Sequence, residues 1–122
     1  MHELALAQEL ILILDQNIVE HRLVEVNQIT IQIGILSNVI PEALRFCFEA
    51  SSQGTIYETA ELVLEEVPVK ALCQSCGEEY ISHKLPFCCP NCGSRQANIL
   101  EGTELVIANL LGKGEEESGG TN

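Results

Sequence analysis

The chain has 122 residues, six basic and eighteen acidic side chains, and a formal net charge of −12. Its length suits one domain, or one small domain that carries a metal-held insertion. Nucleic-acid binding needs basic surface against phosphates and aromatic rings for stacking. The acidity of the chain and its lack of tryptophan argue against that function. An acidic protein is better matched to a basic protein partner or to metal cations.

The first predicted element is a helix from residue 3 to about residue 21. Its apolar side chains recur three or four positions apart, which places them on one stripe: Leu4, Ala7, Ile11, Leu14 and Ile18. Leu6, Leu10 and Ile13 widen this stripe, so we expect the helix to pack on more than one side.

A strand is predicted over residues 24–33. Ile29, Ile31 and Ile33 alternate with Thr30 and Gln32, a pattern that gives the strand one buried face. The glycine that follows ends the run. We expect this strand to cover part of a small core.

A second helix begins at Pro41 and Glu42, because proline fits the first helical position and an acidic residue suits the first turn. The expected apolar stripe consists of Leu44, Cys47 and Phe48. We interpret Cys47 as a small buried residue. Gly54 and Thr55 are expected to end the helix.

Two further strands are predicted. Residues 60–67 alternate between apolar and acidic side chains. The last strand runs from Glu104 to Leu111, and its apolar run Leu105–Ala108 is typical of a central strand covered on both faces.

The cysteines between these two strands constrain the chemistry most. Cys73 and Cys76 form one C-x-x-C pair, Cys89 and Cys92 form another, and twelve residues separate the pairs. Two tight turns that face each other place four thiolates around one point. This set suits tetrahedral Zn(II), and an iron centre less often. The spacing therefore predicts a structural zinc ribbon over about residues 69–101.

Two disulfides are the alternative for these cysteines. We find no apolar segment with a basic flank of the signal-peptide type and no run long enough to span a membrane. We therefore expect a cytoplasmic protein, in which thiols stay reduced. Cys88, beside a predicted ligand, is interpreted as a spare thiol or an alternative ligand. His21 is expected on the surface, and His83 is expected in solvent or near the zinc site without binding the ion.

These elements predict an α+β fold. A small three-stranded sheet carries two helices on one face, and a zinc-ribbon domain is inserted before the last strand. We expect residues 1–68 and 103–112 to form the α+β domain and residues 69–102 to form the zinc ribbon. Residues 113–122 are expected to be a disordered acidic tail.

A second metal site is suggested by His2. The α-amino group of Met1, the backbone nitrogen of His2 and its imidazole are close enough to chelate one ion. Such nitrogen ligands favour a square-planar or tetragonal geometry, typical of Ni(II) or Cu(II). Glu3 is able to add a backbone nitrogen or a carboxylate. The alternative is that His2 is an ordinary solvated side chain.

Together and in order, several segments resemble the HypA/HybF family of nickel-insertion accessory proteins. They are Met1–Leu4, Gly34–Phe48, Gly54–Thr55, Ala60–Leu62, the two cysteine pairs and Glu101–Leu105. The resemblance extends from Met1 to about Leu111. It differs from some relatives at Ile35 and Ile40, where those relatives carry acidic residues.

The resemblance implies more than the residues alone indicate. It implies a transient Ni(II) site at Met1, His2 and Glu3. It also implies a structural Zn(II) site at the four cysteines, Cys73, Cys76, Cys89 and Cys92. It implies cooperation with a nickel-binding GTPase of the HypB type and delivery of nickel to the [NiFe]-hydrogenase large-subunit precursor, with urease served in some relatives. The expected assembly is a monomer or a homodimer.

Three other functions stay open at this point. An enzyme is disfavoured, because we find no nucleophile beside a base, no phosphate-binding loop and no three-ligand zinc pattern in the sequence. A rubredoxin-like electron carrier would use the same four cysteines to hold iron. An adaptor protein would have the zinc ribbon and no second metal.

Overall fold

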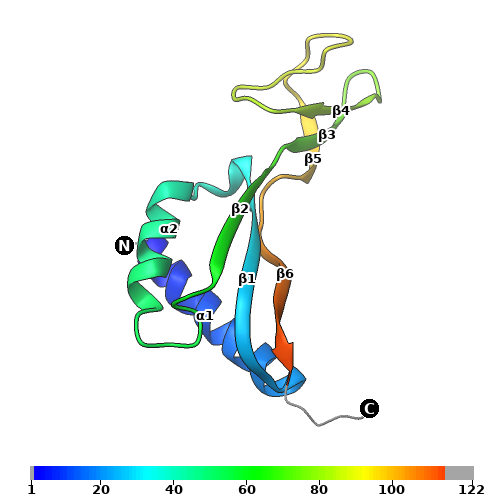
Figure 1. Ribbon diagram of the computed structural model, residues 1–122. Coiled ribbons are helices and arrows are strands. Elements are labelled where there is room, and N and C mark those ends of the chain that lie inside the picture. The colour runs from blue at the N-terminus through cyan, green and yellow to red at the C-terminus, as the bar shows by residue number, and fades with distance from the viewer. Residues whose placement is uncertain (1, 115–122) are drawn as a thin grey trace. The chain divides into compact units, whose positions relative to one another are not determined.

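The computed structural model describes residues 2–114, apart from the side chain of His2. Two helices, α1 (His2–His21) and α2 (Pro41–Ser51), accompany a short 3-10 helix at Ile35–Ser37. The strands are β1 (Leu23–Gly34), β2 (Glu61–Val67), β3 (Val69–Cys73), β4 (Glu79–Ser82), β5 (Ala97–Glu101) and β6 (Leu105–Gly114). They form two sheets, with strand orders β2-β1-β6 and β4-β3-β5 (Figure 1). The predicted α+β class and the order of its elements are confirmed.

The described chain divides into two compact units. The first comprises the residues up to Ile31, the segment Ile40–Val63 and the residues from Ile107 onward. The second comprises Gln32–Val39 and Leu64–Val106. Both cysteine pairs fall in the second unit, which also includes the end of β1 and the residues that follow it, up to Val39. The predicted domain boundaries stay a prediction.

The first unit has its core beneath its two helices. Figure 1 shows α1 and α2 on the same side of the strands of this unit. The buried side chains are Ala7, Leu10, Leu14, Val26, Ile29, Ile31, Leu44, Phe48, Tyr57 and Leu62. The predicted buried face of β1 is therefore confirmed, whereas Cys47 is only half-buried.

The buried face of α1 differs from the predicted stripe. Ala7, Leu10 and Leu14 are buried, whereas Leu4 and Ile13 are 38% and 42% exposed. Apolar residues surround most of this helix, so their spacing is compatible with more than one buried face. Packing against the rest of the unit selects among them.

The end of α2 lies three residues before the predicted one. The backbone N–H and the hydroxyl of Ser52 both donate to the carbonyl of Phe48, at 2.9 and 2.8 Å. A serine hydroxyl that satisfies a terminal carbonyl competes with continuation of the helix. The hydroxyl of the buried Tyr57 then donates to Asp15 Oδ1 at 2.6 Å, which links the following loop to α1.

The prediction that the last strand is central was wrong. β1 is the central strand, and β6 lies at the edge of the described sheet. Val106 and Leu111 on β6 are 38% and 47% exposed. Apolar content alone does not fix a strand's place in a sheet, because exposed apolar residues are common. The strand also continues through Gly114, where a tail was expected; residues 115–122 of that tail lie outside the described residues.

The second unit is built around β3. Ala71 lies opposite Tyr80 on β4 and opposite Ile99 on β5. The buried cluster consists of Val69, Ala71, Cys73, Tyr80 and Cys89, with Ile35, Leu36, Phe87 and Ala97 packed against it. Two of the five buried members, Cys73 and Cys89, belong to the C-x-x-C pairs. The stability of this core therefore depends on whether these thiols are bound to an ion.

None of the helices in the part of the chain that the structure describes has the length and apolar character of a membrane span.

Candidate metal centre

Each C-x-x-C pair forms a tight turn closed by the backbone. Gly77 N donates to the Cys73 carbonyl at 2.9 Å, and Gly93 N donates to the Cys89 carbonyl at 2.7 Å. Both glycines adopt a φ of 80°, in the left-handed region that a residue with a side chain rarely adopts. The glycine after each pair is therefore required by the turn.

Hydrogen bonds hold the two turns to each other. Gln74 N donates to the Gln96 carbonyl at 2.9 Å, and the Ser75 hydroxyl donates to Ser94 Oγ at 3.0 Å. These contacts join segments that lie about twenty residues apart in sequence. These hydrogen bonds orient the two turns toward each other.

The four thiols converge on one point. The sulfur atoms of Cys73, Cys76, Cys89 and Cys92 all lie within 4.8 Å of one another. Cys73 Sγ is 3.5 Å from Cys92 Sγ, and Cys76 Sγ is 3.6 Å from Cys89 Sγ. A tetrahedral ion with Zn–S bonds of about 2.3 Å requires sulfur separations of roughly 3.8 Å. The donor set and its spacing thus fit a tetrahedral thiolate-bound ion.

The same distances argue against the disulfide alternative. A disulfide bond is about 2.05 Å long, whereas the two sulfur–sulfur contacts are 3.5 and 3.6 Å. All six cysteines are free. The structure therefore favours a metal cage over two disulfides.

The cage is half buried. Cys73 and Cys89 are buried in the core of the unit, whereas Cys76 and Cys92 are exposed. The Asn91 side chain donates to Cys76 Sγ at 3.5 Å on the exposed side. One side of a bound ion would therefore be anchored in the core, and the other would be accessible from solvent.

The hydrogen bonds around the cage shift the pKa values of Cys73 and Cys92 in opposite directions. A hydrogen bond from the backbone of Cys76 lowers the pKa of Cys73 to about 6, with further donors from Ser75, Cys92 and Cys76. The pKa of Cys92 is raised to about 12: the Ser94 backbone favours its thiolate, but its hydrogen bond to Cys73 and desolvation outweigh that effect. A cation held by all four sulfur atoms would bind them as thiolates, so its binding would release the protons that the thiols carry.

Cys88 and His83 lie on the exposed surface of the second unit. Neither belongs to the group of four converging ligands, the one such group found among the described residues. His21 is exposed at the end of α1, as predicted.

The structure describes only part of the predicted nickel segment. Met1 lies outside the described residues, and His2 is described only as the first residue of α1. Glu3 is buried, with 9% of its surface exposed. Its carboxylate accepts a hydrogen bond from the backbone N–H of Ile40 at 3.2 Å.

This contact of Glu3 was missed by the sequence reasoning. Ile40 occupies the N-cap position of α2 and has no side-chain oxygen to satisfy the first N–H groups of the helix. No local pattern in the sequence signals this contact, because the two residues lie 37 positions apart. The Glu3 carboxylate accepts from the N–H of Ile40 itself, and so ties the start of α1 to the start of α2.

Comparisons with known proteins agree with this architecture. The family model described as "Hydrogenase/urease nickel incorporation, metallochaperone, hypA" matches residues 1–111. The hydrogenase maturation factor HypA of Moorella thermoacetica is 41% identical over 108 residues, which cover 88% of this chain and 95% of that protein. The HypA of Acidithiobacillus ferrooxidans is 39% identical over 110 residues, 90% of this chain and 97% of that protein.

The fold is also similar to a solved structure. The solution structure of the Ni metallochaperone HypA from Helicobacter pylori matches with a TM-score of 0.67 and 19% identity, over 93% of this chain and 98% of that chain. The chain therefore belongs to the HypA family, whose members are metallochaperones and maturation factors for nickel incorporation rather than enzymes.

Proposed function

We propose that this protein binds Ni(II) at Met1, His2 and Glu3 and delivers it during [NiFe]-hydrogenase maturation, while Zn(II) in the cysteine cage stabilises the second unit. The observation that carries this proposal is the family match, which begins at residue 1 and so includes the Met-His-Glu segment.

Zinc in the cage is supported by the ligands. Cys73, Cys76, Cys89 and Cys92 offer four soft donors and leave no open position, as in structural zinc sites. Bound zinc would supply a fixed cross-link between the two turns. The chain itself supplies the backbone contacts that orient the thiols, so the resulting module is a rigid surface for docking.

Nickel at the N-terminus is supported by a different donor type. The terminal amine, the His2 backbone nitrogen and the imidazole are nitrogen ligands, which suit square-planar Ni(II) better than the thiolate cage does. The hydrogen bond from Ile40 engages the Glu3 carboxylate, so we assign the contribution of Glu3 to the nickel site to its backbone nitrogen. An open planar site allows an incoming ligand to approach axially, which permits transfer by ligand exchange.

The proposed partners follow from family membership and charge. They are a nickel-binding GTPase of the HypB type, as the nickel source, and the large-subunit precursor of the hydrogenase, as the recipient. The net charge of −12 favours association with basic protein surfaces. Cysteines that bind zinc must stay reduced, which is typical of a reducing compartment, so we place the protein in the cytoplasm.

The test is a nickel titration of untagged, zinc-loaded protein by calorimetry. We expect His2→Ala to abolish nickel binding and His21→Ala, a change of an exposed histidine at the other end of α1, to leave it unchanged. Addition of one residue before Met1 should weaken binding, because the amine is then displaced from the chelate. Wild-type affinity in His2→Ala would refute the proposed site.

A further inference from the structure

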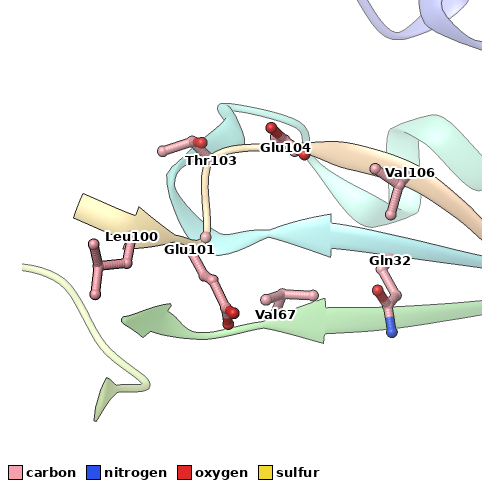
Figure 2. Close-up of a pocket in the computed structure, with 8 residues that line it drawn as sticks. Gln32, Val67, Leu100, Glu101, Thr103, Glu104 and Val106 are labelled. Carbon is pink, nitrogen blue, oxygen red and sulfur yellow. The ribbon is translucent and has the colours of Figure 1, made fainter. Parts of the chain in front are cut away.

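A groove lies within the second unit, where β5 ends and the chain turns into β6. It has a volume of about 270 Å³. Its lining residues are Gln32, Val67, Leu100, Glu101, Gly102, Thr103, Glu104 and Val106 (Figure 2). This volume is just below the roughly 300–1,000 Å³ of small-molecule sites. It suits one long side chain better than a nucleotide or a cofactor.

The backbone around the groove is held in place. Leu36 N donates to the Gly102 carbonyl at 2.7 Å, and Gly34 N donates to the Glu104 carbonyl at 2.8 Å. Gly102 has a φ of 111°, and a Cβ there would lie 2.9 Å from the carbonyl oxygen of Pro68. The turn that carries Glu101 is therefore constrained by these hydrogen bonds and by close backbone packing at Gly102.

The polar side of the groove is acidic. Figure 2 shows the side chain of Glu101 extending toward the strand that carries Val67, whereas Glu104 points the other way. Lys70 lies opposite Glu101 in the β3–β5 register, but its Nζ contacts Glu79 at 4.0 Å. Among the described residues, Glu101 therefore has no ion-pair partner.

A second acceptor lies near this carboxylate. The Gln32 side chain donates its NH₂ group to Glu65 Oε1 at 3.4 Å. That hydrogen bond leaves the Gln32 carbonyl oxygen able to accept, and no basic residue lines the groove. The groove thus offers acceptors and negative charge but no cation of its own.

The remaining walls are apolar. Leu100 is 47% exposed, Val106 is 38% exposed and Val67 is half-buried. A ligand with an aliphatic stem and a cationic head matches both kinds of wall. Arginine fits better than lysine, because its planar guanidinium donates to several acceptors at once.

We propose that this groove binds an arginine side chain of a protein partner, with the guanidinium at the carboxylate of Glu101 and the stem against Val67 and Leu100. The inference goes beyond metal handling and does not depend on where nickel binds. It assigns the second unit a specific contact with a partner. The net charge of −12 would attract a basic partner and speed its association before this contact forms.

The test uses the full chain with zinc bound, labelled with ¹⁵N, and the synthetic peptide acetyl-leucyl-arginyl-leucinamide. We expect saturable shifts of the amides of residues 32, 67 and 100–106. The matched peptide with citrulline, a neutral analogue of arginine, should bind weakly or not at all, and the lysine peptide should be weaker than the arginine peptide.

Two variants carry the same change in net charge. Glu101→Gln should weaken binding of the arginine peptide roughly fivefold, the loss expected for one exposed charge pair. Glu78→Gln, at an exposed glutamate that does not line the groove, should leave it unchanged. Equal losses in both variants, equal binding of the citrulline peptide, or shifts elsewhere on the protein would each overturn the proposal.

Discussion

The two units of this chain are stabilised in different ways. The first has a continuous apolar core in which two helices cover strands, and its buried polar contacts are satisfied by side chains such as Asp15 and Glu3. The second has a small cluster in which two of the buried residues, Cys73 and Cys89, are also metal-ligand candidates. Changes to the cage and changes to the helix core should therefore have separable consequences.

The largest effect is expected from loss of the cage. Zinc binding to structural sites contributes on the order of 10 kcal/mol, and in a domain with a small core this binding free energy stabilises the folded state. Cys73→Ser, or removal of zinc with a strong chelator, should unfold the second unit. The measurement is a ¹⁵N–¹H spectrum, in which amides of residues 69–101 should lose their dispersion. Signals from α1 and α2 should persist. Collapse of all signals together would contradict the separation of the units.

The next effect concerns the core of the first unit. Phe48 is 2% exposed and contacts the Tyr57 ring at a centroid distance of 6.5 Å. Phe48→Ala should destabilise this unit by about 3–5 kcal/mol, the usual loss for a buried aromatic side chain. Urea unfolding followed by helical circular dichroism measures the change. Zinc content should stay at the wild-type value, and a variant that also lost zinc would show that the two cores are coupled.

A smaller effect is expected at the buried hydrogen bond between Tyr57 and Asp15. Burial, followed by the hydrogen bond and charge of Asp15, raises the pKa of Tyr57 well above its ordinary value. Tyr57→Phe should cost about 1–2 kcal/mol, because the phenolic donor is lost while the ring is kept.

The pH dependence of this pair has a definite sign. The folded state favours the protonated phenol, so its contribution is fully present below about pH 10 and is lost as the pH rises further. Unfolding curves of the wild type and Tyr57→Phe should therefore converge above pH 10. A difference that grows with pH would contradict the assigned donor.

The smallest effect is expected at an exposed ion pair on α2. Arg45 and Glu49 are one turn apart, with Nη1 and Oε2 separated by 3.9 Å and both side chains solvated. Glu49→Gln should change the free energy of unfolding by about 0.3 kcal/mol, the usual value for such helix pairs. A loss above about 1 kcal/mol would indicate a contact of Glu49 beyond this pair.

The same contrast explains what was predictable from sequence. The cysteine turns need only local residues, namely two cysteines, their spacing and a following glycine, so the geometry of the cage matched the prediction. The helices and the buried face of β1 followed from periodicity in the same way. The order of the elements followed from the same local patterns, and the family resemblance was confirmed by the comparisons.

What sequence reasoning missed depends on contacts between distant segments. The edge position of β6 is set by pairing with β1, and the buried face of α1 is set by what packs against it. The hydrogen bond from Ile40 to Glu3 joins residues 37 positions apart. Periodicity describes single elements and carries no information on such pairings.

The separation of two metals on one chain is best tested by metal content. Mass spectrometry of untagged protein under native conditions, before and after nickel loading, should give one zinc ion in the first state and one zinc ion plus one nickel ion in the second. His2→Ala should lose only the nickel. Zinc alone in both proteins would leave an adaptor that shares the fold of the family without the proposed nickel delivery, and loss of both ions in the variant would contradict two separate sites.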